Sequence, residues 1–250
     1  MRLVPLLKLH QYETRLDQGP SWGVSGVAEV NLTVRELRRL WKPQKERLNQ
    51  EHHQHPTNIR FHRACSWLQR VEEIQDDAVL DHVLLSLWTA FNALYGQWDG
   101  ERQEPVSDVE CWQHFLDRML ELDRSEWIQT QLHEHKRLVM TLFDDEYLSR
   151  FFWQDPSDQR AKRVRRTRLE AQGWYVEENW TMVLQRLFER IYLLRCQLIH
   201  GASTYDSSYN RTAIRRCSQM MEHLLRTFLR VWAQWGSGED WGIMCYPPMK

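Results

Sequence analysis

Residues 190–211 read RIYLLRCQLIHGASTYDSSYNR, an apolar run that ends at a glycine and passes into an almost wholly polar loop. Gly201 suits the left-handed backbone position that closes many helices. The stretch therefore predicts a core helix over about 175–200 that carries Arg195 and His200 near its end. Its core stripe has the three- and four-residue spacing of a helix with one buried face, at Leu187, Ile191, Leu194 and Leu198.

Arg195 and His200 do not share one face of that helix. At 100° per residue, Arg195 lies about 70° from the core stripe and about 140° from His200. The two side chains can converge through the reach of the arginine, a frayed helix end or a second subunit. The spacing alone also fits another interpretation, in which His200 stabilises the helix dipole and Arg195 lies on a solvated flank.

The same periodicity extends over most of the chain and predicts an all-α helical bundle. Ten glycines and eight prolines in 250 residues are few, which favours helices over a turn-rich β architecture. We predict an N-terminal extension and linker over residues 1–55 and a helical domain over residues 56–250. The helices are expected at about 31–41, 59–75, 78–97, 107–122, 125–142, 143–153, 175–200 and 208–235.

Charge and cysteine content exclude several classes of protein. The formal net charge is −1, so any nucleic-acid site must be a local basic patch. Five cysteines without a CxxC pair indicate reduced thiols, not a disulfide scaffold or a zinc ribbon.

No apolar window is long enough to span a bilayer, so we expect a soluble, cytoplasmic protein without a membrane partner. The histidines of residues 51–56 and 133–135 lack a recognisable zinc spacing, and we expect no metal and no cofactor.

Three segments resemble one known family. LRCQLIHGASTYDSSYNR, at residues 194–211, resembles the signature of HEPN domains, the higher-eukaryote and prokaryote nucleotide-binding helical bundles, in which an Arg-x4–6-His motif closes the penultimate helix. LWTAFNALYG at residues 87–96 and DWGIMCYPP at residues 240–248 resemble the Apea-like HEPN subgroup. The resemblance covers roughly residues 59–250 and implies a HEPN-type bundle.

The resemblance implies a metal-independent endoribonuclease. His200 would act as acid and base and Arg195 as phosphate clamp, while the 2′-hydroxyl of RNA supplies the nucleophile. The family's site usually forms between two copies, which implies a homodimer with a composite active site. A defence or toxin–antitoxin setting, with a regulatory or antitoxin protein partner, also follows from the family.

One residue departs from the family pattern. The position after the arginine, usually Asn, is Cys196, and a thiol is a poor hydrogen-bonding substitute. Asn92 is interpreted either as a core residue bonded to a backbone carbonyl or as a supporting residue beside the site. Tyr205 does not take the position of the tyrosine that follows some family motifs, which is Ala202 here. The residues expected to support the site are Cys196, Asn92, Gln197, Tyr205 and Asn210.

Two basic clusters are candidate RNA contacts. Arg211, Arg215 and Arg216 lie at the start of the last predicted helix, and Arg163, Arg165 and Arg166 lie in RAKRVRRTR. The second cluster also fits a solvated helix flank that pairs with nearby acids. Two other functions stay open from the sequence. One is a catalytically weak or inactive module that binds RNA, nucleotide or a protein partner, and the other is a metal-dependent hydrolase built on the histidine clusters.

Overall fold

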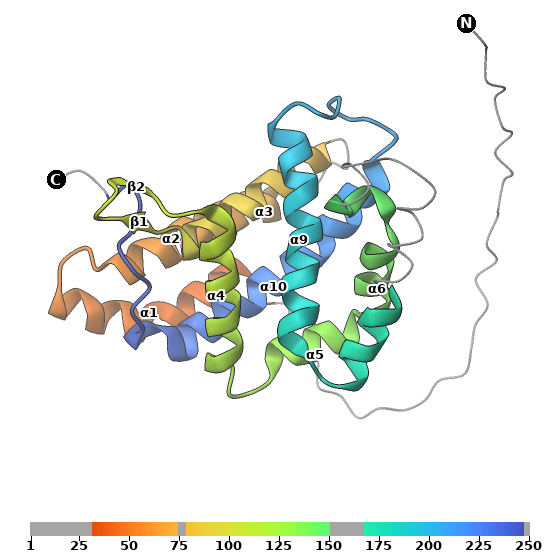
Figure 1. The fold of residues 1–250 in the computed structure, drawn as a ribbon. Coiled ribbons are helices and arrows are strands. Elements are labelled where there is room, and N and C mark those ends of the chain that lie inside the picture. The colour runs from red at the N-terminus through yellow and green to blue at the C-terminus, as the bar shows by residue number, and fades with distance from the viewer. Residues whose placement is uncertain (1–31, 75–78, 151–167, 248–250) are drawn as a thin grey trace, which may run out of the picture. The chain divides into compact units, whose positions relative to one another are not determined.

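The computed structural model describes residues 32–74, 79–150 and 168–247. Helices account for most of these residues, which confirms the predicted all-α helical bundle (Figure 1). Residues 31–250 form one compact unit. Within the described ranges, no helix is both long enough and apolar enough to cross a membrane.

The described part of the chain contains long helices and one small hairpin. The hairpin pairs β1 (Trp98–Asp99) with β2 (Glu104–Pro105) in antiparallel register. Residues 168–176 are also helical. The named helices are α1 (Val34–Glu51), α2 (Pro56–Glu73), α3 (Leu80–Tyr95), α4 (Asp108–Leu122), α5 (Trp127–Glu134), α6 (Lys136–Asp144), the short η2 (Glu146–Leu148), α9 (Trp180–Ile199), α10 (Arg211–Trp235) and the short η3 (Gly236–Gly238).

Helix ends follow local sequence signals. Thr33 and Glu36 form a capping box before α1, because each side chain hydrogen-bonds to the other residue's backbone N–H. Pro56 starts α2, where a missing N–H costs nothing. Asn179 caps α9 by accepting from the Met182 N–H at 3.2 Å. Gly201, with φ of +68°, follows the last turn of α9 in the left-handed conformation.

Helix α10 lies at the centre of the bundle and packs against α1, α3, α4, α5, α6 and α9 (Figure 1). An aromatic cluster joins the elements around it. The ring centroid of Phe91 lies 4.7 Å from that of Phe188 and 6.0 Å from that of Phe228, so residues of α3, α9 and α10 meet in one core. This packing fixes the position of α9 and therefore of Arg195.

The structure differs from the predicted elements in several places. The helix expected at 175–200 begins at Trp180, after a separate helical segment at residues 168–176 that was not predicted. The single helix expected at 125–142 is two helices, α5 and α6, separated at His135. The helix expected at 143–153 is interrupted: residues 143 and 144 end α6, residues 146–148 form η2, Arg150 is helical again, and residues 151–153 lie outside the described residues.

The predicted extension contributes a helix to the same core. α1 covers residues 34–51, including most of the polar segment after Trp41. Trp41 is buried and stacks on Phe61 of α2 at a centroid distance of 4.8 Å. The described part of the extension thus packs with the predicted domain, whereas residues 1–31 lie outside the described residues.

Candidate functional site

Arg195 lies near the end of α9 and is half-buried against aromatic rings. Its guanidinium carbon is 5.8 Å from the ring centroid of Trp88 and 5.9 Å from that of Tyr192, within range of a cation–π attraction. Among the described residues it forms no ion pair with a carboxylate. The two aromatic rings therefore position the guanidinium, and its N–H groups are not paired with a carboxylate.

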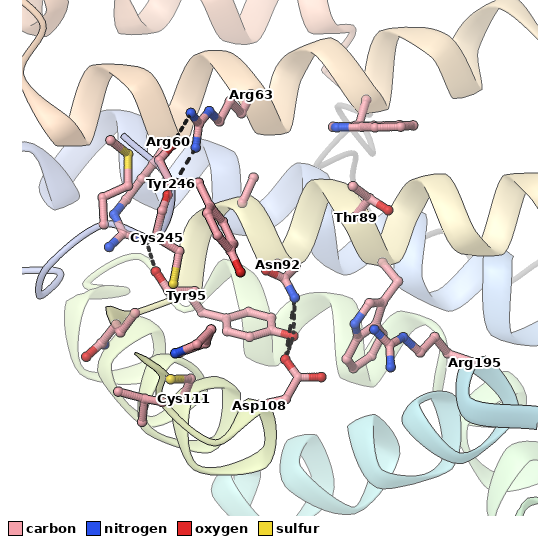
Figure 2. A pocket seen from close by; sticks show the side chains of 18 residues that line it. Arg60, Arg63, Thr89, Asn92, Tyr95, Asp108, Cys111, Arg195, Cys245 and Tyr246 are labelled. Atoms are coloured by element: carbon pink, nitrogen blue, oxygen red, sulfur yellow. Dashed lines mark hydrogen bonds between the residues drawn. The ribbon is translucent and has the colours of Figure 1, made fainter. Parts of the chain in front are cut away.

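The side chain of Arg195 lines a cavity of about 460 Å³ (Figure 2). The cavity lies between α2, α3, the start of α4, α9 and the C-terminal tail, and its size is that of a small-molecule site. The lining residues that matter for its chemistry are Arg63, Trp88, Asn92, Asp108, Arg195 and Tyr246.

A polar network forms one wall of the cavity. The Tyr95 hydroxyl donates to Oδ1 of Asp108 at 2.6 Å, and the Asn92 amide donates to the same oxygen at 3.4 Å (Figure 2). Burial, followed by the negative charge of Asp108, raises the pKa of Tyr95 above its ordinary value. The phenol therefore stays protonated and keeps donating to the carboxylate. Asn92 thus donates to side chains beside Arg195.

Cys196 faces Tyr192, one turn earlier on α9. Burial, followed by the neighbouring Cys196 thiol, raises the pKa of Tyr192 to about 12. Cys196 thus lies beside Tyr192 on its own helix.

His200 ends α9 and is exposed. Its backbone N–H donates to the carbonyl of Cys196, while its side chain has no hydrogen bond among the described residues. It does not line the cavity that contains Arg195. One chain therefore brings Arg195 and Asn92 to the same cavity and presents His200 separately, at the helix end.

The other residues expected to support the site lie around the loop after α9, outside the cavity. Gln197 donates to the carbonyl of Tyr147 at 3.3 Å. The ring of Tyr205 lies 5.4 Å from that of His82. The Asn210 amide donates to the Ser203 hydroxyl at 2.5 Å, which closes the loop before α10.

The basic residues differ in their availability. Arg211 is in an ion pair with the buried Asp81 at 3.0 Å and in a second with Asp206, so it stabilises the loop. Arg215 and Arg216 are half-buried on α10, and Arg216 lies near Asp145. Arg163, Arg165 and Arg166 lie outside the described residues. The described residues contain no group of three His, Cys, Asp or Glu side chains that could hold a metal ion.

Sequence reasoning missed Asp108 and Tyr192. Tyr192 stands three residues before Arg195 and four before Cys196, so helical spacing could have identified it. Asp108 comes from a different helix and has no motif around it. Its place beside the arginine depends on how α4 packs against α9.

Comparisons with protein-family models, curated proteins and solved structures give no match to this chain. The HEPN interpretation therefore rests on the motif residues and their spacing.

Proposed function

We propose that this protein is a metal-independent endoribonuclease of the HEPN type, with a site shared between two copies of the chain. Arg195 binds the scissile phosphate, and His200 transfers the protons. Asn92, Tyr95 and Asp108 shape the cavity beside the phosphate. The resemblance of residues 194–211 to the HEPN signature suggests the reaction, and the availability of Arg195 is the observation that supports it.

Arg195 differs from several partly buried arginines of the described chain that hold a carboxylate. A guanidinium that already holds a carboxylate has little capacity left for a phosphate. Arg195 instead rests on Trp88 and Tyr192, which position it without occupying its N–H groups. The arginines that are in ion pairs with acids include Arg118, Arg186, Arg211 and Arg226.

The reaction needs only these groups and the RNA itself. The 2′-oxygen forms a bond to phosphorus and loses its proton to one imidazole. The bond from phosphorus to the 5′-oxygen breaks, and the leaving oxygen takes a proton from an imidazolium. The products are a 2′,3′-cyclic phosphate and a 5′-hydroxyl. The Arg195 fork stabilises the charge that builds on the phosphorane oxygens.

The position of His200 supports a dimeric site. Its imidazole is exposed beyond the end of α9 and outside the Arg195 cavity of its own chain. A two-fold axis near the ends of two α9 helices would place the His200 of one copy beside the Arg195 of the other. The exposed Ile199 and Tyr205, 53% and 57% accessible, provide apolar surface for such a contact.

A second function is favoured by the same geometry if no dimer forms. His200 does not line the cavity of its own chain, and the Cys196 thiol lies beside Tyr192. A single chain would then bind RNA or a nucleotide at Arg195 without cleaving it.

The test is cleavage of single-stranded and structured RNA by the purified protein in excess EDTA. We expect cyclic-phosphate ends from the wild type and their loss in Arg195→Ala and His200→Ala. His114→Ala, which removes an exposed histidine of α4, is the matched control and should cleave normally. Equal cleavage by His200→Ala, or cleavage that requires added metal, contradicts the proposal. Binding without cleavage by any of these proteins favours the binding module.

A further inference from the structure

One carboxylate oxygen of Asp108 faces the cavity and has no hydrogen-bond partner among the described residues. Its Oδ1 already accepts from Tyr95 and Asn92, while its Oδ2 accepts no hydrogen bond from the described residues. Figure 2 shows this carboxylate and the Arg195 guanidinium pointing toward the same space from α4 and α9. They line one cavity but do not form an ion pair.

The cavity holds a hydrogen-bond acceptor, Asp108, and a cation, Arg195, that do not pair with each other. These two groups together restrict which ligands can bind. An ionised carboxylate only accepts hydrogen bonds, so Asp108 attracts a donor and repels a phosphate. Arg195 only donates, and its fork matches phosphate oxygens. The ligand must therefore carry an anionic group and, a few bonds away, a hydroxyl or amino donor. The 3′-phosphate and 2′-hydroxyl of one ribonucleotide have this arrangement, and DNA lacks the hydroxyl.

We propose that Asp108 accepts a hydrogen bond from the 2′-hydroxyl of a ribonucleotide whose 3′-phosphate lies on Arg195, so that this cavity selects RNA over DNA. The inference rests on the proposed function and adds to it a substrate-binding residue and its selectivity. Tyr95 and Asn92 act as positioning residues, because they fix one carboxylate oxygen and leave the other for the ligand.

The remaining surface of the cavity suits a nucleobase. Trp67 and Tyr246 line it and are 44% and 70% accessible, so both present aromatic rings near its mouth. Stacking on aromatic rings accepts any base, since every base has a π-face. Arg63, which donates to the Tyr246 carbonyl at 2.8 Å, holds the tail that carries one of these rings.

The test is calorimetric titration, in EDTA, with adenosine 3′-monophosphate and its 2′-deoxy analogue. Neither ligand can be cleaved, so binding is measured apart from catalysis. We expect the ribonucleotide to bind roughly tenfold to a hundredfold more tightly, the value of a hydrogen bond to a charged group. Asp108→Asn should bring this ratio close to one and strengthen binding of the deoxynucleotide, because the repelling charge is gone. Arg195→Gln should weaken both ligands and keep the ratio.

Asp117→Asn is the matched control, since this second half-buried carboxylate of α4 lies outside the cavity. It should keep the wild-type ratio. If Asp108→Asn lowers the melting temperature, Tyr95→Phe is the second variant. It keeps the carboxylate but removes the hydroxyl that positions it, so it should reduce the ratio of ribonucleotide to deoxynucleotide affinity.

Equal affinities for the two ligands in the wild type, no binding of either, or an unchanged ratio in Asp108→Asn overturns the proposal. A result that contradicts the role of Asp108 can be distinguished from a result that contradicts the proposed function. A protein that prefers the ribonucleotide but cleaves no RNA leaves the role of Asp108 intact and contradicts the nuclease. A protein that cleaves RNA but keeps its ratio in Asp108→Asn contradicts only the role of Asp108.

Discussion

Arg60 holds the cavity wall together, although nothing in the sequence around it suggests this. The side chain is almost fully buried and donates to four backbone carbonyls, and to no carboxylate. Two acceptors lie at the end of α3, at Leu94 and Gly96, and two lie in the C-terminal tail, at Trp241 and Gly242. Burial lowers the pKa of Arg60 to about 10, so the guanidinium remains charged at neutral pH.

Replacing Arg60 should therefore destabilise the fold. Arg60→Met keeps the apolar stem and leaves four carbonyls without their donor, which we expect to lower the free energy of unfolding by roughly 2–4 kcal/mol. Urea unfolding measures the change. Arg70→Met, at a mostly exposed arginine of the same helix, is the control and should change it by less than about 0.5 kcal/mol. Similar values for the two variants would contradict this account of Arg60.

At the scale of elements, the turn between α4 and α5 depends on a buried acid. Glu126 precedes α5 with φ of +57° and makes no side-chain cap. Asp123 supplies the acceptor instead, taking the Ile128 N–H at 2.6 Å. Burial raises the pKa of Asp123 from its ordinary value of 3.8 and outweighs the opposite effect of the backbone hydrogen bonds from Ile128, Trp127 and Ser125.

This raised pKa predicts a pH dependence that Asp123→Asn should remove. Above pH 3.8 the unfolded chain releases the proton first, while the folded protein still holds it. The folded state binds more protons there, so the free energy of unfolding falls as the pH rises through this interval. Urea unfolding measures the free energy of unfolding of the wild type and of Asp123→Asn. We expect the wild-type value minus the variant's value to be most favourable at acid pH and to decline toward neutrality. A constant or rising difference would contradict it.

The helices were predictable where one face is apolar over several turns, as in α2, α3, α9 and α10. There the spacing of buried residues gives both the type of element and its inner face. The break between α5 and α6 was missed because the residues on both sides of His135 continue a helical pattern, and local sequence carries no Gly or Pro to end it.

At the scale of the whole molecule, the site was predictable only along α9. Arg195, Cys196 and His200 follow from one motif, and their angular separation follows from helical geometry. Asp108 lies 87 positions before Arg195, and only the packing of α4 against α9 brings it to the cavity. Arg211 shows the reverse case, because a basic residue near the motif is engaged by Asp81 and Asp206. The tertiary contacts of a charged residue therefore decide whether it is available to bind a ligand.

The shared site is the central claim, and mixed dimers test it most directly. Arg195→Ala and His200→Ala chains are co-expressed, and cyclic-phosphate ends are measured in EDTA. If Arg195 and His200 act across the interface, each mixed dimer keeps one intact site, and activity returns to about one quarter of wild type. If both residues act within one chain, no mixed dimer has an intact site. Failure of the mixture to cleave RNA that the wild type cleaves would contradict the shared site.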